Sequence, residues 1–413
     1  MLEFLNENTG FSRRICYTIH KKKCSHLFGG GVIPMDYNQA VVDLCAGGAG
    51  AAAAMKPLML HTVLFCPVVR WVCQELRACG VERFFVVCDE NWRKDAADAL
   101  KEIDNVSFFT TLRDALEAAQ GDTVVVPGPV VPVIGEHPRA VYAADAALLR
   151  TRLAEGLTLA DCPADAPAVR PAGSVTAAFL PVPDAAALQE AMPLCRDLLL
   201  RRLALAGVTV MDPANTYVDP RSTVGEGTVL LPGTILRGCT VIGRDCVIGP
   251  NSMIRDCRIG DDTTINASQL NESTIGSHTT VGPFAYVRPD CQVGDHCRIG
   301  DFVELKNSVL GDGTKVSHLT YVGDSDVGRR VNFGCGTVTT NYNGLHKYRC
   351  TVGDDVFLGC NTNLIAPVTV GDGAYTAAGS TVDKDVPAGA LAIARTRQEN
   401  KPGWADRFFK AKK

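Results

Sequence analysis

The sequence predicts two unlike parts in one chain, an α/β Rossmann-like domain followed by a left-handed parallel β-helix. Two patterns predict this division. An aliphatic residue recurs every six positions over most of residues 218–382, whereas the alanine-rich stretch 36–206 alternates strand-like and helix-like segments. The length agrees with it, because 413 residues correspond to two or three domains at about 150 residues each.

Residues 36–206 are expected to form the α/β domain, and residues 1–35 are an unassigned extension in which Met35 is an alternative start of the protein. Strand-like runs alternate with helical stretches, as in βαβ units. The runs are 82–88 and 123–126, and the helical stretches are 63–79, 93–102 and 112–120. A last helix is predicted over 183–206, ending at Gly207, which suits a helix C-cap and a domain boundary.

The six-residue step predicts the second part, residues 207–395, followed by a tail at 396–413. Three phased runs begin at Val218, Ile275 and Val352. Three hexapeptides make one triangular coil of a parallel solenoid, with aliphatic side chains inside and glycine in the tight turns. An antiparallel β-sandwich would instead show a period of two with turns about every 8–12 residues. The step of six therefore favours the β-helix.

The composition excludes several classes of protein. The 41 basic and 45 acidic side chains give a net charge of −4, so no general binding of nucleic acid is expected, since that needs a strongly basic face. The sequence holds no run of about 18 apolar residues, so no membrane span is expected. The 17 cysteines lack C-x-x-C spacing and no secretion signal is evident. They are expected to be free thiols in a cytoplasmic protein, with no metal site.

The segment 339–349 interrupts the repeat with polar and aromatic residues, and a solenoid expels such an insertion as a loop, often on its binding face. Polar residues gather around it in the stretch 288–347. The candidates are Arg288, Glu304, Lys306, His318, Tyr321, Asn332, Asn341, Tyr342 and Lys347. Taken singly, each candidate also fits a solvated surface side chain, and His278 and His296 are expected to be structural. The concentration of the candidates beside one loop predicts a site.

The residue types suit a phosphate and a proton transfer. Three basic side chains near one groove fit a phosphate, because arginine binds it with two parallel hydrogen bonds and lysine adds a point charge. His318 is the best general base, since histidine ordinarily titrates close to neutral pH. We expect a carboxylate such as Glu304 to orient the His318 ring or raise its basicity.

Longer motifs carry a resemblance to a known family. They are VGPFAYVRPD, GDFVELKNS, VSHLTYVGDSDVG, NFGCGTVTTNYNG, HKYR, VGDDVFLGCNTNLIAPVTVGDGA and RQENKPGW. Residues 207–413 thereby resemble the acetyltransferase half of the bacterial bifunctional enzymes of UDP-N-acetylglucosamine synthesis, the GlmU family. The resemblance implies a homotrimeric β-helix that transfers acetyl from acetyl-CoA to the amine of glucosamine 1-phosphate. Its product would feed UDP-N-acetylglucosamine and peptidoglycan synthesis for the cell wall.

The resemblance also implies roles for single residues. The sugar phosphate would be held by Arg288, Lys306 and Lys347, with Tyr321, Asn332, Asn341 and Tyr342 around the sugar. His318 would take a proton from the attacking ammonium, because only the neutral amine is a nucleophile. Coenzyme A would be contacted by Cys360, Ala378 and Arg395. Cys360 departs from the family's usual serine, and a thiol is a weaker hydrogen-bond donor than a hydroxyl.

Residues 40–70 resemble the opening of the same family's uridyltransferase half, but the expected charged residues are missing. After the glycines Gly47, Gly48 and Gly50, alanines 51–54 stand where the family has arginine, and Leu58 rather than lysine follows Pro57. Pro129 stands where an aspartate would hold Mg²⁺, and the VTAAF stretch at 175–179 replaces an Asn-Asn pair. A nucleoside triphosphate needs cations as well as backbone amides. Residues 36–206 are therefore predicted to be a degenerate, inactive nucleotidyltransferase domain.

Three alternatives stay open. The protein could keep both activities, and only then would it need Mg²⁺. It could be a zinc-dependent hydratase built on the same solenoid, although the four histidines 278, 296, 318 and 346 lie far apart in sequence. It could also be a non-catalytic scaffold or pseudoenzyme, which the near-complete set of acetyltransferase residues argues against.

Overall fold

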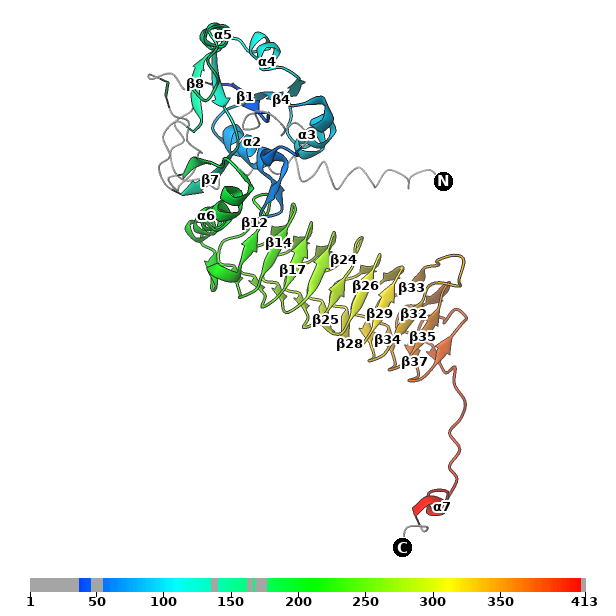
Figure 1. The fold of residues 1–413 in the computed structure, drawn as a ribbon. Helices are drawn as coiled ribbons and strands as arrows, with labels where there is room; N and C mark the ends of the chain where they lie inside the picture. The colour runs from blue at the N-terminus through cyan, green and yellow to red at the C-terminus, as the bar shows by residue number, and fades with distance from the viewer. Residues whose placement is uncertain (1–36, 46–54, 135–139, 162–165, 168–176, 410–413) are drawn as a thin grey trace. The chain divides into compact units, whose positions relative to one another are not determined.

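The computed structural model of this protein describes residues 37–45, 55–134, 140–161, 166–167 and 177–409 (Figure 1). Three features predicted from the sequence lie wholly or partly outside these residues. They are the extension 1–35, the glycine-rich loop with alanines 51–54, and the start of the VTAAF stretch. The chain divides into two compact units, Met1–Asp261 and Asp262–Lys413. The domain borders expected at residues 35, 206 and 395 are different divisions and stay predictions.

The first unit contains a mixed five-stranded sheet with the order β5-β4-β1-β6-β8. Its strands are β1 (Gln39–Asp43), β4 (Arg83–Val87), β5 (Val106–Phe109), β6 (Asp122–Val126) and β8 (Tyr142–Asp145), of which only β8 runs antiparallel to its neighbour. Successive residues of a strand point to opposite faces of a sheet. Ala40 and Val42 accordingly enter one hydrophobic core and Val41 enters another. The sheet is covered on both faces, which confirms the Rossmann-like prediction.

Four helices of this part follow predicted segments closely. They are α2 (Val68–Ala78), α3 (Arg93–Leu100), α4 (Leu112–Ala118) and α6 (Ala185–Leu205), whereas α5 (Ala146–Ala154) lies where no helix was predicted. The helix predicted from residue 63 begins later, because Thr62–Val63 (β2) and Cys66–Pro67 (β3) form a small antiparallel pair joined through two residues with positive φ, Leu64 and Phe65. Pro67 then becomes the N-cap of α2. The remaining elements are 3-10 turns at Leu58–Leu60, Glu90–Trp92 and Pro213–Asn215, and the antiparallel pair β7 (Val130–Ile134) and β9 (Ala177–Pro181).

The same unit also contains coils of parallel strands. They are β10 (Thr209–Val210), β11 (Tyr217–Val218), β12 (Thr223–Val224), β13 (Val229–Leu230), β14 (Ile235–Arg237), β15 (Val241–Ile242), β16 (Val247–Ile248), β17 (Met253–Arg255) and β18 (Arg258–Ile259). Every third strand pairs in parallel, for example β10 with β13 and β13 with β16. Leu230, Leu236 and Ile242 of the six-residue step are buried.

The second unit repeats this arrangement in three parallel sheets. The first contains β19 (Thr264–Ile265), β22 (Thr280–Val281), β25 (Arg298–Asp301), β28 (Lys315–His318), β31 (Asn332–Phe333), β34 (Phe357–Leu358), β37 (Tyr375–Thr376) and β39 (Leu391–Ala392). The second contains β20 (Gln269–Asn271), β23 (Tyr286–Val287), β26 (Glu304–Lys306), β29 (Tyr321–Gly323), β32 (Val338–Thr340), β35 (Asn363–Ile365) and β38 (Thr381–Val382). The third contains β21 (Thr274–Ile275), β24 (Gln292–Val293), β27 (Val309–Leu310), β30 (Ser325–Val327), β33 (Cys350–Val352) and β36 (Val368–Val370).

These sheets confirm the predicted parallel β-helix. Figure 1 shows successive members of the second sheet, β26, β29, β32 and β35, following one another along the solenoid. Ile299, Leu305 and Leu310 place their side chains inside one coil, because each sits at the inward position of a different sheet. Each residue therefore lies beside the residue at the equivalent position of the next coil. This stacking of coils positions the side chains of the site.

The insertion after β32 leaves the coil as predicted. Tyr342 and Lys347 pair in a short antiparallel bridge, and the Tyr348 amide donates to the Asn341 carbonyl at 2.8 Å. Leu345 at the tip has 82% of its surface exposed. Beyond the coils a short helix, α7 (Asp406–Phe409), lies in the tail. Among the described residues, no helix is long and apolar enough to cross a membrane.

Candidate active site

One hollow of about 370 Å³ contains the three cations predicted to bind a phosphate. It is lined by Arg288, Pro289, Asp290, Lys306, Asn307, Asp324 and Lys347. Arg288 follows β23, Lys306 ends β26, and Lys347 comes from the expelled loop. The stacking of coils brings the first two together, because β23 pairs with β26 in parallel register. The loop then adds the third cation.

Two of the three cations already have a carboxylate partner. Arg288 Nη1 donates to Glu304 Oε1 at 2.9 Å, and this hydrogen bond raises the pKa of Arg288. Lys306 Nζ lies 3.1 Å from Asp324 Oδ2. Within the described residues, no carboxylate lies at ion-pair distance from Lys347. The nearby Lys306 ammonium lowers the pKa of Lys347, since two adjacent positive charges repel.

His318 contacts Asp301. These residues end β28 and β25 and are direct partners across the two strands. His318 Nδ1 and Asp301 Oδ1 lie 2.7 Å apart, and this hydrogen bond lowers the pKa of Asp301. When Nδ1 carries the proton and donates it to the carboxylate, Nε2 keeps its lone pair and can accept a proton. This is the arrangement that a general base needs.

The prediction that Glu304 orients His318 is wrong for this structure. Glu304 lies on β26, in a different sheet from His318, and its partner on the next strand is Tyr321. Its carboxylate instead accepts a hydrogen bond from Arg288. Asp301 takes the expected place because the parallel register of β25 and β28 aligns it with His318.

The residues expected around the sugar are only partly brought together. Asn341 Nδ2 donates to Asp324 Oδ2 and also lies 3.5 Å from the Tyr321 hydroxyl. The Tyr342 hydroxyl donates to the Gly344 carbonyl at 2.5 Å within the loop. Asn332 lies on β31, where its strand partner is Lys315. Among the described residues, the structure gives no hydrogen bond between the Asn332 side chain and another predicted site residue.

The residues expected at coenzyme A form a separate row on successive coils. The Gly379 amide, next to Ala378, donates to the Cys360 carbonyl at 2.8 Å, and the Asn361 amide donates to the Cys335 carbonyl at the same distance. Arg395 lies beside this row, since its Cδ would be 3.7 Å from a Cβ at Gly379. Cys360 is an exposed free thiol. Cys360 and Ala378 thus lie on an exposed surface beside the Arg395 guanidinium. A guanidinium binds phosphate groups, so this surface fits a coenzyme that carries them.

Sequence reasoning missed Asp301, Asn307 and Asp324. Asp301 and Asp324 resemble ordinary turn residues in the sequence. The available signal was spacing, because Asp301 precedes His318 by 17 residues and Asp324 follows Lys306 by 18, each about one coil.

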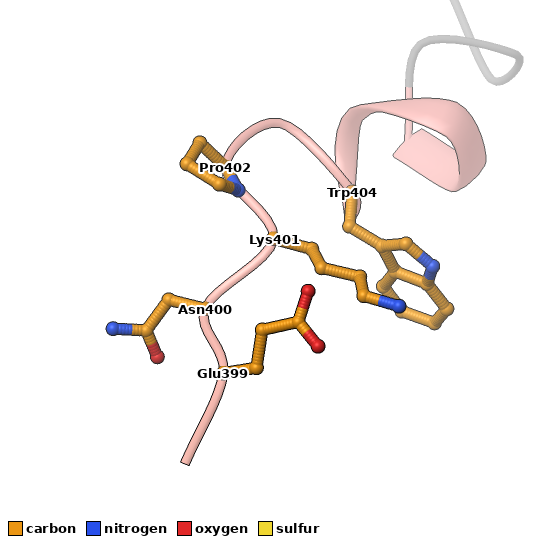
Figure 2. A pocket seen from close by; sticks show the side chains of 5 residues that line it. All are labelled: Glu399, Asn400, Lys401, Pro402 and Trp404. Carbon is orange, nitrogen blue, oxygen red and sulfur yellow. The ribbon is translucent and has the colours of Figure 1, made fainter. Parts of the chain in front are cut away.

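A second hollow of about 440 Å³ lies in the tail and is lined by Glu399, Asn400, Lys401, Pro402 and Trp404. Figure 2 shows that these five side chains come from one short, continuous stretch of chain. They are all exposed. A hollow of this kind, open and formed by neighbouring residues, gives no basis for assigning a site.

No group of three or more histidine, cysteine, aspartate or glutamate residues that could hold a metal ion exists in the described part of the chain. His278 and His296 stack with ring centroids 4.8 Å apart, and His278 Nδ1 lies 3.5 Å from Asp262. The histidine geometry needed by the zinc-hydratase alternative is therefore not found among these residues.

The repeat region of this chain is similar to known proteins. The model of the bacterial transferase hexapeptide family (six repeats) matches residues 221–256, 272–307 and 349–384. The chain is 50% identical over 227 residues to the bifunctional protein GlmU of Geobacillus sp. (strain WCH70), covering 55% of this chain and 50% of that protein. This chain is similar to GlmU. The predicted resemblance to the GlmU family is thereby confirmed.

Other GlmU proteins give the same result. GlmU of Geobacillus thermodenitrificans is 53% identical over 230 residues, covering 56% of this chain and 50% of that protein. The chain thus spans about half the length of the curated GlmU relatives it matches. A solved structure, the Arabidopsis UDP-N-acetylglucosamine acyltransferase, is 17% identical over 45% of this chain and 77% of that chain, with a TM-score of 0.28. That likeness is too low to carry an argument.

Proposed function

We propose that this protein transfers acetyl from acetyl-CoA to the amine of glucosamine 1-phosphate. The observation that carries the proposal is the hollow in which Arg288, Lys306 and Lys347 meet. Three cations around a small polar hollow suit a dianionic phosphate on a small molecule. The match to the hexapeptide transferase family and the similarity to GlmU support the same assignment.

His318 would supply the proton transfer. With Nδ1 held by Asp301, Nε2 accepts a proton from the substrate ammonium and leaves a neutral amine. The amine nitrogen attacks the thioester carbonyl carbon, a carbon–nitrogen bond forms, and the carbon–sulfur bond to coenzyme A breaks. The first proton passes from Nε2 to solvent. Nε2 then takes the second proton from the nitrogen as the carbon–nitrogen bond forms, and this second proton neutralises the leaving thiolate. Asp301 stabilises the charged ring throughout, as the carboxylate does in an acid–base triad.

The coenzyme would lie along the row of Cys360, Ala378 and Arg395. Arg395 suits its phosphates, because a guanidinium binds phosphate with two parallel hydrogen bonds. Cys360 would lie beside the acetyl group as a simple replacement of the family's serine. We also propose that the protein is a cytoplasmic homotrimer in which neighbouring solenoids complete each site, as the resemblance implies.

The α/β part is proposed to lack uridyltransferase activity. Two described residues support this proposal. Arg70 is buried, with 4% of its side chain exposed, and lies 3.4 Å from Glu102, so it does not offer a free charge to a triphosphate. Pro129 precedes β7 where the family has its Mg²⁺-binding aspartate. The bifunctional alternative remains because the protein is similar to GlmU, and in that case Mg²⁺ would be required.

Product analysis by mass spectrometry tests the proposal. Purified protein is given acetyl-CoA and glucosamine 1-phosphate, with and without UTP and Mg²⁺. We expect N-acetylglucosamine 1-phosphate to accumulate in both mixtures. Formation of UDP-N-acetylglucosamine would contradict the loss of uridyl transfer, and no product would favour a pseudoenzyme. A dye that detects released thiol is unsuitable, because the 17 cysteines give background.

A further inference from the structure

Asp324 is the centre of a hydrogen-bond group at the phosphate hollow. Its side chain has only 6% of its surface exposed. The carboxylate accepts hydrogen bonds from Lys306 Nζ at 3.1 and 3.4 Å, from Asn307 Nδ2 at 2.7 Å, and from Asn341 Nδ2. One donor is a predicted phosphate ligand and another is a predicted sugar ligand. Asp324 thus joins two parts of the candidate site that lie on separate segments.

The backbone fixes Asp324 in this place. The Asp324 amide donates to the Lys306 carbonyl at 2.9 Å, and the Asp324 carbonyl accepts a hydrogen bond from the Cys350 amide at 3.2 Å. The residue adopts φ +48°, a left-handed conformation that aspartate tolerates better than most residues. Its carboxylate is therefore anchored between the coil that carries Lys306 and the coil that follows the expelled loop.

The carboxylate is ionised. Burial alone would favour the neutral acid, but the hydrogen bonds from Asn307, Lys306 and Asn341 outweigh it and lower the pKa of Asp324. A buried carboxylate requires such donors, since a buried charge without partners is strongly unfavourable. The same interactions hold each donor in one orientation.

We propose that Asp324 is a positioning residue, which holds the Lys306 ammonium and the Asn341 amide in one frame so that the phosphate and the sugar ring bind in a fixed relation. This inference rests on the proposed acetyl transfer and assigns a residue that neither the sequence nor the mechanism above had used. A purely structural role for Asp324 is the competing explanation, and it predicts equal losses for both substrates together with a lowered unfolding temperature.

Lys347 reports on the charge of Asp324. The groups that act on the Lys347 ammonium are Lys306 and Arg288, which lower its pKa, and Asp324, which raises it. Replacing Asp324 by asparagine removes an opposing charge and should lower the pKa of Lys347 further. Phosphate binding should then weaken at a lower pH than in the wild type. A loss of fold stability alone would not move this pH dependence.

The test compares Asp324→Asn with Asp355→Asn in the full-length protein. Asp355 is a matched control, because it also adopts a positive φ, at +58°, and also pairs with a cation, Arg330, at 2.6 Å. Rates of acetyl transfer by both variants are measured by mass spectrometry over a range of pH. Asp324→Asn should raise the KM for glucosamine 1-phosphate by about 10- to 100-fold, as expected for lost contacts to a charged group. The KM for acetyl-CoA should stay within about twofold.

Two further variants keep the inference testable. Lys347→Arg combined with Asp324→Asn should lose the pH shift, because arginine stays charged. Asn307→Ala removes one donor but keeps the Asp324 charge, so a smaller rise in the KM for glucosamine 1-phosphate is expected even if Asp324→Asn fails to fold. A wild-type KM for glucosamine 1-phosphate in Asp324→Asn or in Asn307→Ala would overturn the inference, and so would a wild-type pH dependence in Asp324→Asn. Equal losses for both substrates together with a lowered unfolding temperature would overturn it as well.

Failure of the proposed function gives a different pattern. If the wild type forms no acetylated product, binding of inorganic phosphate is measured by calorimetry instead. Weaker phosphate binding by Asp324→Asn than by Asp355→Asn would then support the positioning of Lys306, and equal binding would overturn it.

Discussion

His318→Ala is expected to lower kcat strongly while leaving the protein folded. A positioned general base contributes about 10²- to 10⁴-fold to a rate. The His318 ring has 52% of its surface exposed, so water reaches the reacting amine and partly replaces the missing base. We therefore expect a loss near the lower end, about 10²- to 10³-fold. The KM values of both substrates should change little, because His318 acts on the proton rather than on the phosphate or the coenzyme.

Mass spectrometry of N-acetylglucosamine 1-phosphate gives the rate, and circular dichroism gives the unfolding temperature. Raising the pH should partly restore the variant, because more of the substrate amine is then neutral without a base. His296→Ala is the matched control, since His296 is also an exposed histidine on the solenoid but stacks on His278. A wild-type kcat in His318→Ala would refute the assigned role, and so would an equal loss in His296→Ala.

Three further predictions follow from the site. Asp301→Asn should lower kcat by about 10- to 100-fold, less than His318→Ala, because the ring keeps its place but loses the carboxylate that stabilises its charged form; an unchanged kcat would contradict this. The pKa of Lys347 is lowered by the neighbouring Lys306 ammonium, so its charge is lost at a lower pH than that of an ordinary lysine. The KM for glucosamine 1-phosphate should therefore rise at alkaline pH in the wild type and not in Lys347→Arg, and identical pH profiles would exclude Lys347 from phosphate binding. Cys360→Ser should lower the KM for acetyl-CoA by about two- to fivefold, because a hydroxyl donates a stronger hydrogen bond than a thiol, whereas a large loss of kcat would point to a covalent role of the thiol.

The architecture of the solenoid could be predicted from the sequence because one physical rule generates it. Each coil needs inward aliphatic side chains at a fixed step, so Leu230, Leu236 and Ile242 mark three successive faces. The expelled loop was equally visible, since its polar and aromatic residues break that step. The start of α2 was not, because the residues at Leu64 and Phe65 with positive φ turn the chain where the helical pattern already begins.

The candidate site was predicted as a set of residue types but not as a set of contacts. Arg288 and Lys306 were found because the polar candidates are concentrated beside the insertion and lie within motifs that resemble the GlmU family. The carboxylate partners depend on which strands pair. Asp301 ends β25, which pairs with the His318 strand β28, whereas Glu304 lies on β26 and pairs with Tyr321 in a different sheet, a result that only the paired strands determine.

The two ion pairs in the hollow differ in burial, and this difference indicates how a phosphate would enter. Arg288 and Glu304 have 40% and 39% of their side chains exposed, so their pair adds little stability and a phosphate can replace Glu304. Lys306 and Asp324 have 17% and 6% exposed, and separating them would leave a buried charge without its partner. A bound phosphate would therefore draw Arg288 away from Glu304, but would join Lys306 while Asp324 stays in place. Lys347 has no carboxylate partner among the described residues, so it would join the phosphate without breaking an ion pair, and the loss of its charge at alkaline pH is expected to weaken phosphate binding.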